Sequence, residues 1–261
     1  MTTGSGLTVE VRDRIARIQL DRPARLNAID STTMRDLVQA FDSLGRDESV
    51  WAILLTGAGD RAFSSGIDLH EVNEENQAER LAAMPMGGVQ RNMFEVVLEC
   101  PKPVVAGING VAAGAGCELA LAADVRIAAE HARIGLPEAK RGMGANFGCQ
   151  LLPRLIPRGL AFEMLYTGEL ISAEQALHWG LLNRVVPSES LTEEALAMCE
   201  RIVANAPITV QRYKAMISKG GELPIASALR LNVGPNPYTS ADRAEGVAAF
   251  VEKRQPRWQG R

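Results

Sequence analysis

The most apolar stretch of this 261-residue sequence is Val111-Ala112-Ala113-Gly114-Ala115-Gly116-Cys117-Glu118-Leu119-Ala120-Leu121-Ala122-Ala123. It follows an apolar strand expected over residues 104–108, and its pattern predicts a glycine-rich turn and then a buried helix. Glu118 is the only charged residue in the stretch, and a second carboxylate, Glu138, follows Ile134-Gly135-Leu136-Pro137. Ionised carboxylates are rarely buried without a partner, because leaving water is costly or raises the pKa. The two glutamates therefore predict a site retained for chemistry.

The surrounding sequence predicts an α/β fold. Apolar and polar residues alternate over 7–20, which is typical of a β-hairpin. Ser31 is placed to cap a helix whose apolar residues share one face, namely Met34, Leu37, Val38, Phe41 and Leu44. Short apolar strands are expected over 50–55, 104–108 and 125–128. Strands that alternate with amphipathic helices favour a parallel sheet.

The character of the sequence changes after Pro187. Three helices are expected there, over 191–204, 208–218 and 241–253, with few strand signals. We therefore predict a main α/β core over 1–190 and a helical C-terminal region over 191–261. Residues 71–88 are polar and then contain Met and Gly, and we expect them to form the most mobile segment.

The composition excludes some classes of partner. The apolar fraction is 46%, the charged fraction 23% and the formal net charge −3, as in an ordinary globular protein. Such a charge gives no general attraction to nucleic acid or to anionic membranes. No run approaches the ~18 apolar residues of a membrane span, and residues 1–6 show no signal core. The four cysteines are widely spaced without a C-x-x-C pair, which favours reduced thiols and a cytoplasmic protein.

Two turns could present backbone N–H groups to a negative charge. The N-terminus of the helix after Gly114 offers free donors and the positive end of the helix dipole. The pattern is neither a dinucleotide-binding motif nor a P-loop, because no acidic residue ends a second strand and no Lys-Ser/Thr follows. Gly114 and Gly116 could equally serve close helix–strand packing. A second small-residue turn, Ala62-Phe63-Ser64-Ser65-Gly66-Ile67-Asp68-Leu69, can present donors in the same way, although an ordinary turn would look alike.

Six motifs, in their order and spacing, resemble the enoyl-CoA hydratase/isomerase (crotonase) superfamily over nearly the whole chain. They are Arg22-Pro23-Ala24-Arg25-Leu26-Asn27-Ala28, residues 62–69, Pro101-Lys102-Pro103-Val104-Val105-Ala106 with residues 109–121, Leu136-Pro137-Glu138, residues 167–183, and residues 244–254. The resemblance implies a spiral of repeated ββα units. It also implies that the helical C-terminal region assembles a homotrimer or a dimer of trimers.

The resemblance further implies an acyl-CoA thioester as substrate and water addition to a 2-enoyl-CoA as the reaction. The backbone N–H groups of Ile67 and Ala115 would form the oxyanion hole that holds the thioester carbonyl. Glu118 would act as base on the water and Glu138 as proton donor to C2, although the two roles could exchange. Two neighbouring carboxyls in a dry site cannot readily both ionise, so one of them is expected to be protonated.

The same resemblance implies further substrate- and CoA-binding residues, which are Arg25, Ala28, Ser65, Gly66, Asp68, Leu69, Gly114, Asn146, Phe250 and Lys253. Arg25 and Lys253 would meet the CoA phosphates, Lys253 from a neighbouring subunit, but Arg25 could equally be a solvated surface charge. Asn146 departs from the family pattern, in which hydratases tend to have Gly and dienoyl-CoA isomerases an Asp. A neutral Asn cannot act as a base, but its side chain could narrow the water site.

Neither a metal nor a redox cofactor is expected. The three histidines lack metal-ligand spacing, and Ser64 and Ser65 lack a recognisable His/Asp partner set for hydrolysis. Two alternatives to hydration stay open. An enoyl- or dienoyl-CoA isomerase would use the same enolate, and a non-catalytic acyl-CoA-binding homologue would keep the oxyanion hole without turnover. The presence of both carboxylates argues against the second alternative.

Overall fold

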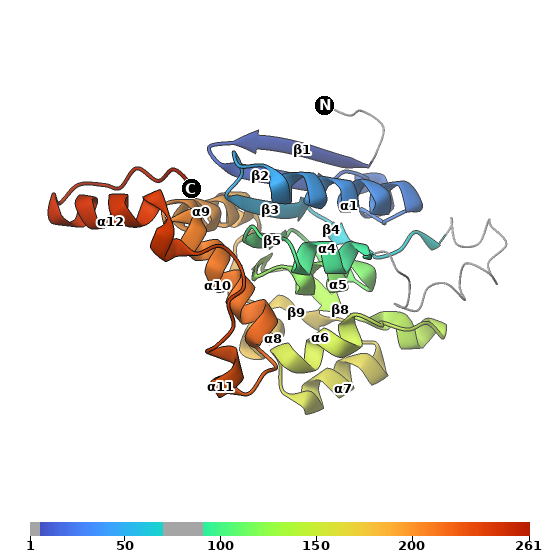
Figure 1. Ribbon diagram of the computed structural model, residues 1–261. Helices are drawn as coiled ribbons and strands as arrows, with labels where there is room; N and C mark the ends of the chain where they lie inside the picture. Colours follow the sequence, from blue (N-terminus) through green and yellow to red (C-terminus); the bar gives the residue numbers. More distant parts are fainter. Residues whose placement is uncertain (1–5, 70–90) are drawn as a thin grey trace.

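The computed structural model describes residues 6–69 and 91–261, in which strands and helices alternate as predicted (Figure 1). The strands are β1 (Leu7–Arg12), β2 (Ile15–Leu20), β3 (Ala52–Gly57), β4 (Ala62–Ser64), β5 (Val104–Ile108), β6 (Val111–Ala113), β7 (Val125–Ala129), β8 (Arg133–Gly135), β9 (Ile171–Ser172) and β10 (Arg184–Val186). The α-helices are α1 (Ser31–Arg46), α4 (Met93–Leu98), α5 (Ala115–Ala122), α6 (Gly148–Leu155), α7 (Arg158–Thr167), α8 (Ala173–His178), α9 (Leu191–Val203), α10 (Pro207–Gly220), α11 (Ile225–Ala228) and α12 (Ala241–Val251). Short 3-10 helices include η1 (Pro23–Arg25) and η2 (Pro137–Arg141). The segment over 71–88 that the sequence predicts to be mobile lies outside the described residues.

Two sheets organise the fold. The larger has the order β1-β2-β3-β5-β7-β10, with β1 and β2 antiparallel as the predicted hairpin and the other neighbours parallel. The smaller has the order β4-β6-β8-β9 and is parallel except for β8 and β9. The pairs β3/β4, β5/β6 and β7/β8 each place one strand in each sheet, and α4, α5 and η2 with α6 follow them in turn. This spiral of ββα units confirms the predicted architecture.

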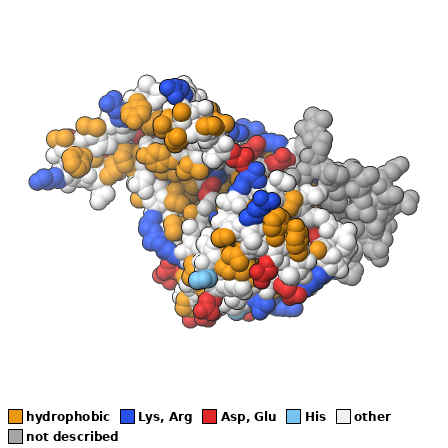
Figure 2. Space-filling view, turned by 90° about the horizontal axis from the view of Figure 1, so that it is seen from below, with side chains coloured by type: hydrophobic (Ala, Val, Ile, Leu, Met, Phe, Trp, Pro, Cys, Tyr) orange, Lys and Arg blue, Asp and Glu red, His pale blue; other side chains and the backbone are white. Residues whose placement is uncertain are grey.

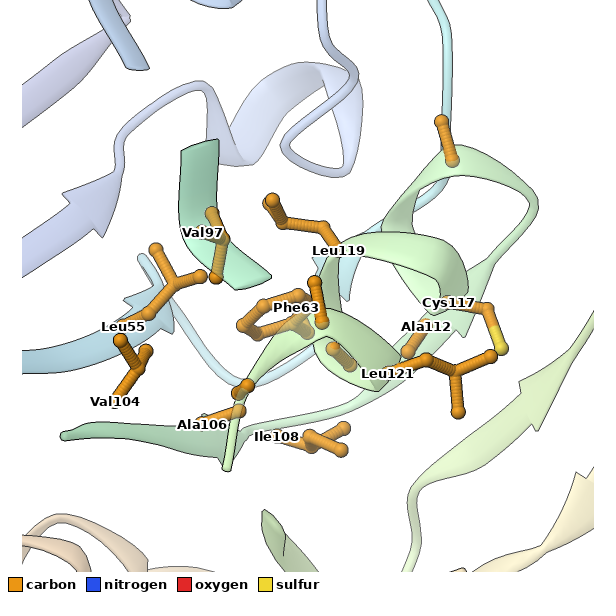
Figure 3. Close-up of a cluster of buried hydrophobic side chains, with 14 of the residues drawn as sticks. Leu55, Phe63, Val97, Val104, Ala106, Ile108, Ala112, Cys117, Leu119 and Leu121 are labelled. Carbon is orange, nitrogen blue, oxygen red and sulfur yellow. The ribbon is translucent and has the colours of Figure 1, made fainter. Parts of the chain in front are cut away.

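Buried apolar side chains fill the space between the sheets and the helices. Figure 3 shows Phe63 of β4 among Val97 of α4, Leu119 of α5 and Ala106 of β5, all of them fully buried. A Cβ at Gly116 would lie 2.3 Å from the carbonyl oxygen of Ser64, so only glycine lets α5 pack this closely on β4. The close-packing interpretation of Gly116 is therefore confirmed.

A buried arginine holds the C-terminal end of α5. Arg126 of β7 donates through Nη1 to the carbonyl oxygen of Ala123 (2.6 Å) and through Nε to that of Leu181 (2.7 Å). A cation at a helix C-terminus complements the helix dipole. The helix that carries Glu118 is thereby fixed to β7 and to the segment that precedes β10.

The helical C-terminal region begins with α9, which packs on the larger sheet. Its Leu191, Ala195 and Cys199 form a second buried cluster with Leu54 of β3 and Ile127 of β7. Helices α10, α11 and α12 follow to one side, and α12 projects farthest from the sheets (Figure 1). The helices predicted in this region are confirmed. No helix among the described residues is long and apolar enough to cross a membrane.

Three local predictions are corrected by the structure. Asp30 and not Ser31 caps α1, because Asp30 Oδ1 accepts a hydrogen bond from Thr33 N at 2.7 Å and Ser31 is already helical. The strand expected over 50–55 is Ala52–Gly57. Residues 111–113 are not part of a turn but form β6, because they pair with β4 on one side and β8 on the other.

Candidate active site

A cavity of about 790 Å³ opens where the first turn of α5 meets the residues that follow β4. Nine of the predicted site residues line it, namely Ser65, Gly66, Ile67, Leu69, Gly114, Ala115, Glu118, Glu138 and Asn146. Apolar side chains, among them Met34 and Phe94, complete part of its wall. The structure therefore brings together residues from three separate sequence motifs and Asn146, which lies beyond the third of these motifs.

The first backbone donor is Ile67. It forms a parallel bridge with Ile29, in which Ile29 N donates to Gly66 O (2.8 Å) and Asp68 N donates to Ile29 O (2.9 Å). In an extended chain the N–H of the intervening residue points to the opposite side from these bonds. Within residues 6–69 and 91–261 no acceptor takes the Ile67 N–H. This N–H is therefore available to a ligand in the cavity.

The second backbone donor is Ala115, the first residue of α5. A helix leaves its first N–H groups without intrahelical partners, and Ala115 N finds no other acceptor in the described part of the chain. Gly66, with a φ of +98°, lets the two segments approach, because a Cβ there would lie 2.9 Å from Ala113 O and 3.3 Å from Ala115 N. Two free N–H groups thus line one cavity at the positive end of a helix dipole, where an oxyanion can bind.

Glu118 lies in the first turn of α5 and is only 5% exposed. Its Oε1 accepts a hydrogen bond from the backbone N of Gly148, the first residue of α6, at 2.7 Å. Burial, together with the nearby charge of Glu138, raises the pKa of Glu118 to about 7, although the Gly148 N–H acts in the opposite direction. A carboxyl with this pKa can gain and lose a proton near neutral pH.

Glu138 reaches the same end of α5 from η2. Its Oε1 lies close to Gly114, where a Cβ would be only 3.1 Å away. Its Oε2 is buried and has no hydrogen-bond partner in the part of the protein that the structure describes. Burial raises the pKa of Glu138, while its own backbone N–H and the charge of Arg141 act in the opposite direction. Since no donor compensates a charge on Oε2, the surroundings favour the protonated form.

Asp68, predicted to contact the substrate, is instead engaged inside the protein. It is 6% exposed, and its Oδ2 lies 3.0 Å from Nη1 of Arg22 in an ion pair. The carboxylate is outside the cavity lining, although the neighbouring Ile67 is part of it. Asp68 thus lies next to the cavity wall and contacts Arg22 instead of the cavity.

Four other predicted contact residues also lie outside the cavity wall of this chain. Arg25 is exposed on η1, and Ala28 is buried. Phe250 is 85% exposed on α12, and Lys253 is exposed just beyond that helix. Their contact with CoA stays a prediction.

The sequence did not reveal two contributors to the site. Gly148 supplies the N–H that holds Glu118. Phe147 stacks on Phe94 with ring centroids 5.1 Å apart, and both rings line the cavity. The only signal for Gly148 is a glycine in the loop after Glu138, because a backbone N–H can come from almost any residue type and so leaves no mark in the sequence.

Across the two described ranges, no three His, Cys, Asp or Glu side chains are grouped as a metal ion would need. His131 is engaged elsewhere, with Nδ1 2.7 Å from Ser188 Oγ and Nε2 2.8 Å from Asp60 O. The chemistry of the cavity thus centres on two backbone donors and two carboxyls.

Comparisons with known proteins agree with this arrangement. The family model for enoyl-CoA hydratase/isomerase matches residues 10–261. A short-chain-enoyl-CoA hydratase of Clostridium acetobutylicum is 34% identical over 254 residues, which cover 96% of each chain. A carnitinyl-CoA dehydratase of Salmonella typhimurium is 38% identical over 95% of each chain. Among solved structures, an enoyl-CoA hydratase from Bacillus anthracis superposes with a TM-score of 0.90 and 35% identity, over 98% of this chain and 100% of the other.

Proposed function

This chain belongs to the enoyl-CoA hydratase/isomerase family, and we propose that it adds water reversibly across the 2,3 double bond of an enoyl-CoA thioester. One observation carries the proposal. The buried Glu118 and the half-buried Glu138 share a cavity with two backbone N–H groups that have no acceptor among the described residues. Withdrawing two carboxyls from water without an ion pair among the described residues is costly, and a protein that only bound the thioester would not need them.

The oxyanion hole starts the reaction. The thioester carbonyl oxygen accepts hydrogen bonds from the N–H groups of Ile67 and Ala115, which draw electron density from the double bond and make C3 electrophilic. Water adds to C3 as Glu118 takes one of its protons, and the electron pair of the double bond moves onto the carbonyl oxygen as an enolate. Fixed N–H dipoles in a site shielded from water stabilise that charge, and losing one such donor typically costs about 3–4 kcal/mol.

Glu138 completes the reaction by giving its proton to C2 as the enolate collapses. The hydrogen bond from Gly148 N supports Glu118 as the ionised member, and the uncompensated Oε2 of Glu138 supports it as the protonated one. A general base works best when its pKa lies near the working pH, and the pKa of Glu118 is about 7. The water proton that Glu118 receives returns through solvent to Glu138, so each cycle adds one water and restores the pair.

The CoA moiety needs cations, and we propose that Arg25 and a neighbouring subunit's α12 region supply them. The α12 region carries Phe250, Val251 and Lys253, all exposed in the single chain. Figure 2 shows hydrophobic side chains gathered on the lobe that projects at the left, where α12 lies. Exposed apolar surface of this kind is typical of an interface, which supports an oligomer, and the family resemblance implies that the oligomer is a homotrimer or a dimer of trimers.

The proposal includes neither a metal nor a redox cofactor. Water addition leaves the overall oxidation state of the substrate unchanged, so no electron carrier is required, and two N–H groups and two carboxyls account for every proton and charge that moves. We also propose a cytoplasmic location, because three of the four cysteines are buried free thiols, as in proteins of reducing compartments.

A panel of 2-enoyl-CoA thioesters from short to long acyl chains tests the function. Hydration removes the absorbance of the conjugated thioester and gives a 3-hydroxyacyl-CoA heavier by one water. Isomerisation would move the double bond without a change in mass. Tight binding of every thioester without turnover would identify an acyl-CoA-binding protein. Only the first outcome supports the proposal.

A further inference from the structure

We propose that Arg22 and Asp68 form a positioning pair that aims the Ile67 N–H at the thioester carbonyl. The inference rests on the proposed function, and it assigns a role to two residues that do not line the cavity. It concerns how the oxyanion hole is held in place.

One guanidinium joins the two segments on either side of the bridge. Nη1 of Arg22 lies 3.0 Å from Asp68 Oδ2 and donates to the carbonyl oxygen of Ala28 at 2.7 Å. Its Nη2 lies 3.2 Å from Asp30 Oδ2. Arg22 thereby binds both neighbours of Ile29 and the residue that follows Ile67.

The contacts of Arg22 are made by residues that flank the bridge between Ile29 and Ile67. Ile29 N bonds Gly66 O, and Asp68 N bonds Ile29 O, so the two peptide groups on either side of the Ile67 side chain are fixed in direction. A turn of the Ile67 N–H away from the cavity would carry the Asp68 carboxylate away from Arg22. The ion pair therefore opposes that turn.

The pair is shielded and anchored. The Asp68 side chain is 7% exposed and that of Arg22 24%, so water screens their attraction only in part. Arg22 N donates to Asn27 Oδ1 (3.0 Å), and Asn27 Nδ2 donates to Ala62 O of β4 (2.7 Å). The backbone of Arg22 is thus anchored. Its planar guanidinium makes directional hydrogen bonds, which a single ammonium group cannot do in the same way.

The chain offers a matched ion pair away from the oxyanion hole. Lys214 Nζ of α10 lies 2.7 Å from Asp124 Oδ2 and also donates to Lys102 O at 3.0 Å, and the Lys214 side chain is 8% exposed. Its loss would remove a comparably buried contact without touching the Ile29–Ile67 bridge. Lys214→Met is therefore the control for a merely structural effect.

The experiment compares Arg22→Met, Arg22→Lys, Asp68→Asn and Lys214→Met with the wild-type protein. The first readout is kcat and KM for hydration of crotonyl-CoA. The second is the absorption maximum of a bound cinnamoyl-CoA with an electron-donating para-amino group, which moves to longer wavelength when hydrogen bonds polarise its carbonyl. Because this readout needs binding but no turnover, it reports directly how the backbone N–H donors are oriented towards the carbonyl.

We expect Arg22→Met to lower kcat by about 10- to 100-fold with a much smaller change in KM, because a misplaced donor forfeits part of the oxyanion stabilisation. The red shift of the bound probe should shrink in parallel. Arg22→Lys should recover part of both, and Arg22→Met combined with Asp68→Asn should lose no more than Arg22→Met alone. Lys214→Met should keep the full shift and kcat.

A full red shift and full kcat in folded Arg22→Met would overturn the proposal, and so would equal losses in Lys214→Met. If Arg22→Met does not fold, Arg22→Lys and Asp68→Asn decide the matter by the same two readouts. A wild-type protein that shifts the probe but hydrates no enoyl-CoA would refute the hydratase function alone. The positioning role would still be judged by the shift.

Discussion

Buried and partly buried carboxylates occur in two regions of this molecule, and their surroundings differ. On α12, Asp242 is 1% exposed and accepts two backbone N–H groups, at 2.6 and 3.0 Å, from the returning C-terminal tail. On the same helix both oxygens of Glu245 are bound by Arg254, at 2.6 and 2.9 Å. In the cavity, Glu118 accepts the N–H of Gly148 at 2.7 Å and is also acted on by the backbone of Phe147, and Glu138 Oε2 has no partner among the described residues.

The acidities follow these surroundings. Hydrogen bonds from Arg254 and from the Arg257 N–H lower the pKa of Glu245 to about 2. Burial raises the pKa of Glu118 to about 7. A carboxylate surrounded by donors stays ionised and stabilises the fold, whereas one with few donors can exchange protons. Burial with few donors characterises the reactive region, and donors on both carboxylate oxygens characterise the structural one.

The strongest test of this comparison is to remove each carboxyl in turn. Glu118→Gln and Glu138→Gln should each lower kcat for crotonyl-CoA hydration by about a thousandfold, because general acid–base groups contribute about 10²–10⁴. Steady-state kinetics would measure the loss, and KM should change far less than kcat. The size and shape of the side chain are kept, so the loss reports proton transfer.

Two matched variants complete that test. Glu169 also lines the cavity, but it is exposed and paired with Lys140, so Glu169→Gln should keep kcat within about twofold. Glu245→Gln, in the structural region, should do the same. Near-wild-type turnover in either active-site variant would refute the assignment of that glutamate.

The pH dependence of stability should have opposite signs in the two regions. The pKa of Glu118 is raised by folding, so the free energy of unfolding that it contributes is complete below about 4.5 and is lost as the pH rises towards 7. The free energy of unfolding of Glu118→Gln, relative to that of the wild type, should therefore increase as the pH rises from 4.5 to 7. The increase should reach up to about 3 kcal/mol at pH 8. The pKa of Glu245 is lowered, so the stability it contributes is present above about 4.5 and is lost as the pH falls towards 2.

Urea denaturation at a series of pH values would measure both effects. Glu245→Gln should be less stable than the wild type at pH 7, and the difference should close only in acid. A Glu118→Gln variant whose stability runs parallel to the wild type from pH 4.5 to 8 would show that Glu118 titrates alike in the folded and unfolded states. The proposed distinction between the regions would then fail.

A smaller effect is expected from Asp242, the most deeply buried carboxylate of the structural region. Asp242→Asn keeps the shape but removes the charge that the two backbone N–H groups bind, so the free energy of unfolding should fall by about 1–3 kcal/mol. Urea denaturation would measure the loss, and kcat of the folded variant should be unchanged. A large fall in kcat with intact stability would place Asp242 in the reactive region instead.

The side-chain pattern of the sequence predicted much of this arrangement. The hairpin over 7–20, the parallel strands and the C-terminal helices follow from apolar periodicity, which local residues determine. Glu118 and Glu138 could be singled out because a charge within apolar neighbours is unusual wherever it lies. The donors Ile67 and Ala115 came from the family resemblance, and neither N–H has an acceptor among the described residues.

What the sequence missed depends on contacts between distant residues. Strand β6 has three residues and exists because β4 and β8 flank it, a pairing that no local pattern records. Asp68 looked like a ligand contact until its partner Arg22 was placed beside it. Gly148 donates through its backbone, so its identity carries no sign of that role. Asp30 was passed over as a cap because Ser31 next to it is an equally good candidate by residue type.

The smallest predicted effect concerns Arg141, a cation of the described residues whose charge acts on Glu138. Arg141 is exposed, and its charge lowers the pKa of Glu138 against the effect of burial. Arg141→Met should therefore raise that pKa, but only slightly, since water screens the interaction. Because Glu138 must be protonated to act as the acid, the alkaline limb of kcat/KM should move to higher pH by the same amount. Lys140→Met is the control: Lys140 is already neutralised by Glu169, so its removal should move the limb less. A shift to lower pH, or equal shifts in the two variants, would show that Glu138 is not the acid whose ionisation sets that limb.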